Sequence, residues 1–375
     1  MIHFAFSLRG TDHEERGRCC EDCSRTFSIP GGCGLVIADG VGSASMAAFA
    51  SATACKEASS FIRNYFPPEG DRESLLSLLR CAMNRCLSVL IRAAEYAGMD
   101  PMEFATTLSI VLQTPKGTCI AHAGDGGIIG LNAVSGDYDI LASPVKGEDG
   151  HLVVPLQGGP GTWIIRDFDE SYASVMASTD GLLDALYLPP LMKYAGEETG
   201  VYPYELQKVM DLAWMEKRDL DPADLKEYLI ARFEREDRYV TGDDKTLAVL
   251  IDPSVKAVRR SGAYYRKQDF ALLEMRRDGE IRRQMESREQ EIEKADAVSE
   301  KKQNLPSLTM EKEEEKPLPV SLPDPVSFSR ERPVRERNLS KAGKSVEKEG
   351  TIKEKPAGFC NRIRSFLLAD PTEED

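Results

Sequence analysis

The chain has 375 residues, of which 41% are hydrophobic and 29% are charged, and its formal net charge is -14. This length suffices for one large domain with a substantial core or for two smaller domains. The acidic balance, with a pI near 5.0, argues against nucleic-acid binding through an overall positive field and suits the binding of cations.

The N-terminus and the cysteines predict a cytoplasmic location. The opening residues, Met1 to Phe6, have no basic region before an apolar run, so no signal peptide is expected. No apolar stretch approaches the length of a membrane span. The nine cysteines are an odd number, and many stand in apolar surroundings, as do Cys55, Cys81, Cys86 and Cys119. Reduced, buried thiols are therefore expected.

Hydrophobic patterning predicts strands and helices throughout residues 1–253. Strands at 2–7, 25–29 and 34–38 are followed by helices at 43–65 and 71–97, the second capped by Asp71. Further strands are expected at 107–113, 118–123, 127–132, 138–141, 163–167 and 173–178. Helices at 204–217 and 222–236 and a strand at 245–251 close the domain. This order is not that of a doubly wound sheet, and it predicts an α+β fold, an antiparallel β-sandwich flanked by helices.

The composition changes sharply after Pro253. Glu, Lys, Arg, Ser and Pro dominate from about Ser261 onward, and such a segment cannot bury enough apolar surface to offset its ordering entropy. Within it, 270–297 is rich in helix formers with a thin apolar stripe, which favours a solvated helix over a coiled coil. We predict a domain at 1–253, a linker and helix at 254–299, a disordered charged tail at 300–355 and a short amphipathic segment at 356–375.

Aspartates stand at the ends of several predicted strands. Asp39, Asp125 and Asp180 each follow an apolar strand and precede glycine, Asp243 comes just before a strand, and Asp22 precedes another. Asp-Gly is also a common hairpin turn, and any one pair alone fits a turn better than a ligand. Four such aspartates in order along the chain, each next to an apolar strand, favour a ligand site over four separate turns. Carboxylates gathered together repel one another, and Mg²⁺ or Mn²⁺ accepts such hard oxygen ligands.

Six motifs resemble, in order, those of the type-2C, metal-dependent protein phosphatase family (PPM). They read GTDHEERGRCCEDCSRTF, ADGVGSASMAAFASA, FATTLSIVL, AHAGDGGIIGL, ASTDGLLDAL and GDDKTLAVLI, and they span about Ser7 to Asp252. The resemblance implies a β-sandwich with two metals in a cleft at one edge. It also implies hydrolysis of phosphoserine and phosphothreonine in protein substrates by a metal-activated water, with no protein nucleophile.

The resemblance also implies a role for each matching residue. Asp39 would bridge two Mn²⁺ or Mg²⁺ ions, and the Gly40 carbonyl, Asp180 and Asp243 would complete the protein ligands. Asp22 and Glu21 would sit beside them and hold metal-bound water. Asp125 and Asp184 resemble the pair that holds a weaker third ion. The predicted metal and catalytic set is therefore Asp22, Asp39, Gly40, Asp180 and Asp243.

Two positions depart from the better-known eukaryotic branch of the family. Its phosphate-gripping arginine, four residues before the acidic pair, is Gly17 here, and its histidine after Asp-Gly is Val41. The opening with His13 instead resembles a bacterial sub-branch, so His13 either lies at the cleft or caps a turn. Arg16 and Arg18 are candidates for phosphate contact, although solvent exposure without function is favoured for each.

Three other functions compete with the metal-dependent phosphatase. A zinc site is disfavoured, because Cys20 and Cys23 form a single Cys-x-x-Cys pair with no matching second pair. A nucleotide-binding loop is disfavoured, because no glycine cluster is followed by Gly-Lys-Ser/Thr. A catalytically silent scaffold with the phosphatase fold remains the rival. The retained carboxylates argue against the scaffold, and the missing arginine argues mildly for it.

Two segments could select partners. The resemblance implies that 187–239 forms a flap beside the cleft. At the C-terminus, Phe359, Ile363, Phe366 and Leu367 recur at helical spacing between basic residues, which fits a tethered docking peptide for a partner, the domain itself or an anionic membrane. A frayed tail is nearly as well supported, because so short a helix is unstable alone.

Truncation after Lys355 tests the docking peptide. Loss of docking should leave turnover of a small ester unchanged but alter turnover of a protein substrate or the location in the cell, because a tethered peptide raises local concentration. The three quantities are measured side by side for the full and truncated chains. Three unchanged values would rule the docking role out.

Overall fold

The computed structural model describes residues 1–68, 70–146, 152–196 and 200–303, with side chains described up to Ile292. Residues Met1–Arg283 form one compact unit. The domain boundaries expected at 253, 299 and 355 stay predictions. The docking segment at 356–375, and most of the tail expected at 300–355, lie outside the described residues.

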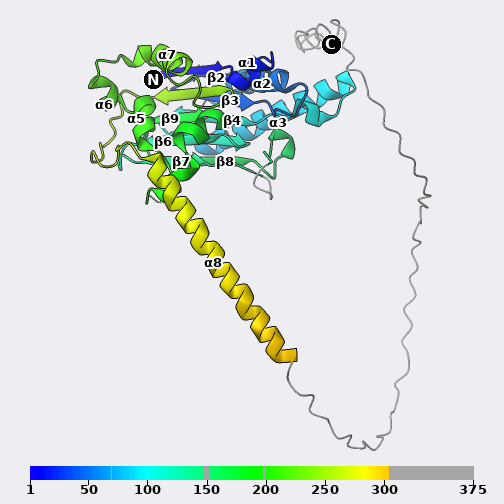
Figure 1. Ribbon diagram of the computed structural model, residues 1–375. Coiled ribbons are helices and arrows are strands. Elements are labelled where there is room, and N and C mark those ends of the chain that lie inside the picture. Colours follow the sequence, from blue (N-terminus) through cyan, green and yellow to red (C-terminus); the bar gives the residue numbers. More distant parts are fainter. Residues whose placement is uncertain (69, 147–151, 197–199, 304–375) are drawn as a thin grey trace, which may run out of the picture. The chain divides into compact units, whose positions relative to one another are not determined.

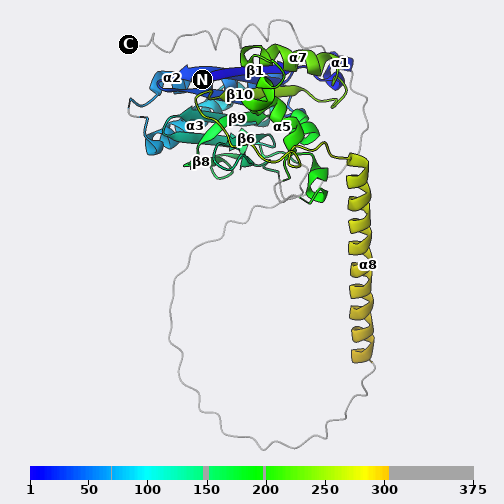
Figure 2. The same cartoon turned by 90° about the vertical axis from the view of Figure 1, so that its left-hand side faces the viewer.

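Within the described residues, ten strands form two five-stranded sheets in which every neighbouring pair is antiparallel (Figures 1 and 2). The order in the first sheet is β1 (Ile2–Leu8), β10 (Lys245–Ile251), β9 (Tyr172–Ser178), β6 (Gly127–Asn132) and β7 (Tyr138–Ala142). The order in the second is β2 (Asp22–Ile29), β3 (Gly32–Asp39), β4 (Leu108–Thr114), β5 (Gly117–Ala123) and β8 (Ile164–Phe168). The predicted α+β sandwich is confirmed.

The two sheets pack face to face through an apolar layer. Leu35 and Val111 of the second sheet join Val175 and Leu250 of the first in one fully buried cluster. Strands with both faces covered read as continuous apolar runs, which is why β3, β4 and β10 were recognisable in the sequence. This buried apolar layer fixes the ends of the strands that border it.

Helices α2 (Ala47–Tyr65) and α3 (Arg72–Ala97) cover the outer face of the second sheet. Small residues such as Ala50, Ala54 and Ala58 let α2 lie close to β3. By length and composition α3 alone, among the described helices, could cross a membrane, so the expectation that no stretch reaches that length was wrong. Its apolar face is nevertheless buried in the core with α2 and the sheet.

A second helical layer covers the outer face of the first sheet. Its elements are α4 (Asp180–Leu182), η3 (Leu183–Tyr187), η4 (Pro190–Tyr194), α5 (Pro203–Met210), α6 (Leu212–Glu216), η5 (Pro222–Asp224) and α7 (Leu225–Arg235). The helix predicted over 204–217 is broken at Asp211, whose extended backbone starts α6 and whose carboxylate accepts from the amides of Ala213 and Trp214. Short helices α1 (Thr11–Glu15), η1 (Pro101–Phe104) and η2 (Leu156–Gly158) were not predicted.

This second layer includes most of the segment expected to form a flap. Leu206, Met210, Leu229 and Phe233 are buried with Met176 and other residues of the first sheet. The described residues of 187–239 therefore supply much of the hydrophobic core on the outer face of the first sheet. Its apolar face is therefore structural, and its position as a flap beside the cleft stays a prediction.

Helix α8 (Phe270–Gln303), the long yellow helix in Figure 1, begins inside the compact unit. Leu273 is buried with Met192 and Tyr202, and the backbone amide of Gln268 donates to the Tyr202 hydroxyl at 3.2 Å. Met285 and Ile292, further along the helix, are exposed. A helix forms where one was predicted, and it continues past its predicted end at 297.

The described cysteines are all free. Cys55, Cys86 and Cys119 are buried, as expected, but Cys81 is exposed because its side of α3 faces away from the core.

The cap of α3 is open to a direct test. The Asp71 carboxylate accepts from the Ser74 amide at 3.0 Å. Asp71→Ala should therefore lower the free energy of unfolding, measured by urea denaturation, because the Ser74 amide loses its acceptor. Asp71→Asn is the matched control and should retain most of the stability, because its amide oxygen can still accept. Equal losses in the two variants would contradict the capping role.

Candidate functional site

Both sheets deliver aspartates to the same edge of the sandwich. Asp22 at the start of β2 is the register partner of Asp39 at the end of β3. In the first sheet, Ser178 at the end of β9 pairs with Gly127 at the start of β6, so Asp180 and Asp125 lie at one edge. Ser178 also pairs with Leu247 of β10, which places Asp243 beside them. The aspartates expected to form the site are therefore brought together.

The gathered carboxylates disturb one another's protonation. Burial, followed by the charges of Asp22, Asp180, Asp243 and Asp125, raises the pKa of Asp39 well above its usual range. Burial, with Asp125 and Asp243, raises the pKa of Asp180 to about 7. Burial, with Asp244 and Asp243, raises the pKa of Asp22 to about 8. An edge that holds so many acids favours protons or metal cations.

Two threonines hold the backbone of Asp39. Thr106 Oγ1 donates to the Asp39 carbonyl and the Asp39 amide donates to Thr107 Oγ1, each at 2.8 Å. The Thr107 amide donates to the same Asp39 carbonyl at 2.7 Å. These contacts explain why the strand beginning at 108 is preceded by threonines, and they aim the Asp39 side chain at the edge.

Gly40 has no room for a side chain. A Cβ there would stand 2.4 Å from the Ala47 carbonyl oxygen at the start of α2. The Gly40 amide donates to the Glu21 carbonyl at 3.1 Å, so the turn after β3 is tied to the acidic pair before β2. The glycine lets helix, turn and acidic pair approach closely enough to share one edge.

The donor set fits divalent cations. Asp180 Oδ1 is buried and has no hydrogen-bond partner. The strongest electrostatic neighbours of Asp39 are all carboxylates, and carboxylate and carbonyl oxygens are the ligands that Mg²⁺ and Mn²⁺ take. Within the described ranges, no group of three or more His, Cys, Asp or Glu side chains is already close enough together to hold a metal ion. The cysteines near Asp22 form no such group either.

Asp244 was missed by the sequence analysis, which assigned only its neighbour Asp243. Its side chain is buried, with a residue exposure of 3%. Oδ1 accepts from the Gly10 amide at 2.7 Å and Oδ2 from the Glu21 amide at 2.6 Å. Asp243 is exposed. The two adjacent acids therefore differ in their contacts. Asp244 is buried and joins the 10–21 segment to the start of β10, whereas the Asp243 side chain stays exposed.

His13 and Arg18 lie at the cluster, whereas Arg16 is exposed on the surface. His13 Nδ1 is 3.0 Å from Asp244 Oδ2, and its Nε2 is 3.7 Å from Glu21 Oε2. Arg18 follows Gly17, whose φ of 65° turns the chain back. Its Nη2 donates to Glu21 Oε1 at 2.6 Å. The structure therefore places a histidine and an arginine beside the acids, and their roles stay predictions.

His122 is a second residue that the sequence analysis missed. It is fully buried, and burial lowers its pKa to about 4, so the ring is neutral. Nε2 donates to the Gly124 carbonyl at 3.0 Å, and Nδ1 accepts from the Ser109 hydroxyl at 2.8 Å. Since a carbonyl only accepts, this tautomer follows from the geometry. The pair fixes the turn that carries Asp125.

Asp125 and Asp184, the pair expected at a third ion, face a lysine. Lys146 Nζ lies 3.7 Å from Asp184 Oδ2. Burial raises the pKa of Asp184 and of Asp125, and the positive charge of Lys146 opposes the rise at both.

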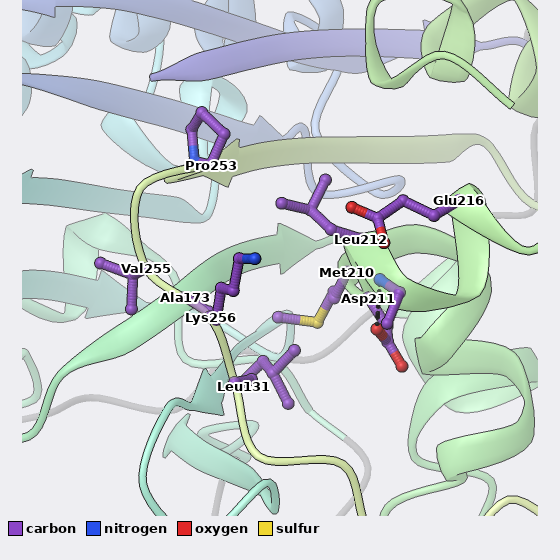
Figure 3. A pocket seen from close by; sticks show the side chains of 11 residues that line it. Leu131, Ala173, Met210, Asp211, Leu212, Glu216, Pro253, Val255 and Lys256 are labelled. Carbon is purple, nitrogen blue, oxygen red and sulfur yellow. Dashed lines mark hydrogen bonds between the residues drawn. The ribbon is translucent and has the colours of Figure 1, made fainter.

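A cavity of about 140 Å³ lies away from this cluster (Figure 3). It adjoins Ala173 and Leu131, at the opposite ends of β9 and β6 from Ser178 and Gly127. Met210 and Val255 give it apolar walls, and no group of the acidic cluster reaches it.

The raised pKa values predict the pH dependence of stability. The folded domain retains protons that the unfolded chain releases near pH 4, so this stabilisation is present below about pH 4 and is lost as pH rises through about 7 and 8. In the presence of a chelator, the free energy of unfolding should therefore fall by about 1 kcal/mol or more between pH 5 and 8. Asp22→Asn should flatten the fall in urea denaturation, and the exposed control Asp278→Asn should not. A stability that rises over this interval would contradict the cluster.

Comparisons with known proteins agree with the geometry. The protein phosphatase 2C family model matches residues 9–210. No curated protein matches the sequence.

Among solved structures, the serine/threonine phosphatase PstP/Ppp of Mycobacterium tuberculosis is 18% identical, with a TM-score of 0.46, over 66% of this chain and 97% of that one. Stp1 of Staphylococcus aureus is 15% identical, with a TM-score of 0.44, over 67% and 95%. The S. agalactiae serine/threonine phosphatase is 14% identical, with a TM-score of 0.48, over 67% and 99%. At these values the likenesses support no statement about function. The family match, which covers more than half of the chain and all but the last of the acidic motifs, shows that the chain belongs to the protein phosphatase 2C family.

Proposed function

We propose that this chain is a metal-dependent protein serine/threonine phosphatase that hydrolyses phosphoserine and phosphothreonine monoesters. The observation that carries the proposal is the convergence of Asp22, Asp39, Asp180 and Asp243 at one edge of the sandwich. Carboxylates gathered without a counter-charge repel one another, so a set that is built into rigid strand ends is best explained by a bound positive charge.

The chain's own groups suit two Mn²⁺ or Mg²⁺ ions. Asp39 would hold both ions, with the Gly40 carbonyl, Asp180 and Asp243 completing the protein ligands. When bound, the ions would supply Lewis-acid activation of water and neutralise charge on the phosphoryl oxygens. Glu21 and Asp22 would orient that water. The buried Thr179 hydroxyl donates to Asp22 Oδ2 at 2.8 Å and so holds the Asp22 carboxylate in position for this role.

Arg18 would contact the substrate phosphate in place of the arginine that is absent at position 17. Its guanidinium group lies against Glu21 and within 3.5 Å of the Gly42 carbonyl, beside the turn that follows Asp39. A fixed, planar cation of this kind suits phosphate oxygens. Its partial exposure leaves a face open to a substrate. His13, held between two acids, would position Glu21 and Asp244.

Phosphoprotein substrates and a cytoplasmic location are part of the proposal. The rival, a catalytically silent scaffold, would have no use for four repelling carboxylates at one edge. Whether the chain turns over substrate decides between the two.

Asp39→Asn is the decisive variant. Turnover of a chromogenic phosphate ester and of a phosphoserine peptide should require added Mn²⁺ or Mg²⁺ and fall at least about 100-fold in the variant, because even partners behind metal ligands cost 10–100-fold. The exposed Asp278→Asn serves as the control and should match the parent chain. The fold should survive, since removing one charge relieves repulsion.

Two outcomes would overturn the mechanism. The first is full turnover by Asp39→Asn, and the second is turnover that persists under thorough chelation. A parent chain that is folded and binds Mn²⁺ but never turns over either substrate would instead favour the scaffold.

A further inference from the structure

Lys146 reaches the acidic edge from a segment that the metal-ion prediction did not include. Its ammonium nitrogen lies 3.7 Å from Asp184 Oδ2, and its charge also acts on Asp125. Asp184 lies in η3 and Asp125 in the turn between β5 and β6, so three separate elements meet here. The carboxylates nearer the centre of the cluster differ, because the strongest electrostatic neighbours of Asp39 are all acids.

Backbone contacts hold Lys146 in place. The amide of the preceding residue, Val145, donates to the Gly124 carbonyl at 2.7 Å, directly before Asp125. Lys146 itself pairs with Val153 in an antiparallel bridge. Gly124 is fixed in turn by His122. The lysine is therefore anchored to the same turn that presents Asp125.

This arrangement conflicts with the third ion that the family resemblance implies. Asp125 and Asp184 carry two negative charges, and a divalent cation between them would stand beside the ammonium group of Lys146, whose backbone is anchored. Like charges a few ångströms apart repel strongly where water is partly excluded. The ion pair is about 40% exposed on each side and contributes little to stability. Its effect would instead be that the Lys146 ammonium group takes the position of a third divalent cation.

We propose that the Lys146 ammonium group is the resident counter-charge of the Asp125–Asp184 pair and keeps a third divalent cation out. The chain then works with two metal ions, and Lys146 is the residue that sets this number. The proposal rests on the metal centre of the proposed function and adds to it the reason why that centre is limited to two ions.

Metal counting tests the proposal without reference to activity. The full chain is dialysed against Mn²⁺ at concentrations up to about 1 mM, and bound metal per chain is measured for the parent, Lys146→Gln, Lys146→Arg and Lys146→Gln/Asp184→Asn. We expect two ions in the parent and in Lys146→Arg, because arginine keeps the charge. Lys146→Gln should bind three, with affinity for the third raised about tenfold or more, and the double variant should return to two.

The outcomes separate this proposal from the one on which it rests. A parent chain that binds three ions, or a Lys146→Gln variant that binds no more than the parent, overturns the role of Lys146 and leaves the metal centre standing. Absence of bound Mn²⁺ from all four proteins overturns the metal centre, and the role of Lys146 with it. Urea denaturation confirms that each variant is folded, which is expected because the Lys146 side chain is exposed.

Discussion

Mutual repulsion among carboxylates at one edge of the sandwich is the constraint on which this structure depends. Asp22, Asp39 and Asp180 all have raised pKa values because each is buried near the others. Left to itself, such a cluster would disperse its charges into water. That it persists means that the framework around it resists the repulsion, so much of the architecture can be understood as the support of one acidic edge.

The support has three parts. The apolar layer between the sheets fixes the strand ends, as shown by the complete burial of Leu35, Val175 and Leu250. Thr106 and Thr107 then hold the backbone of β3 at its last residue. Asp244, finally, closes the edge by accepting from the amides of Gly10 and Glu21. A buried polar group that is fully hydrogen-bonded in this way adds rigidity instead of strain.

Cations are placed around the rim of the cluster and not at its centre. Arg18 pairs with Glu21 on one side, and Lys146 pairs with Asp184 on the other. Both lysine and arginine would weaken the binding of a metal ion if they reached the central acids. On the rim, the arginine can face a substrate phosphate and the lysine can limit the number of ions. Charge pairing at the rim of the cluster thus accounts both for the proposed phosphate contact and for the proposed limit on the number of metal ions.

The sequence by itself determined the sheet strands, the two helices over the second sheet and the presence of aspartates at strand ends. These features depend on local periodicity and on residues next to one another in the chain, as in the apolar runs before Asp39 and Asp180. The roles that the family resemblance implies for those aspartates stay predictions, although the structure brings their side chains to one edge.

Tertiary structure alone decided which neighbour of an acidic pair is buried and what faces it. Asp243 and Asp244 are chemically alike in the sequence, but only Asp244 meets the amides of Gly10 and Glu21, more than 200 positions away. Lys146 is an ordinary surface residue in the sequence until β5, β7 and η3 bring it to Asp184. The layer over 187–239 likewise became core because it buries apolar side chains on the first sheet. Burial and charge pairing depend on contacts between distant segments, and no local pattern encodes them.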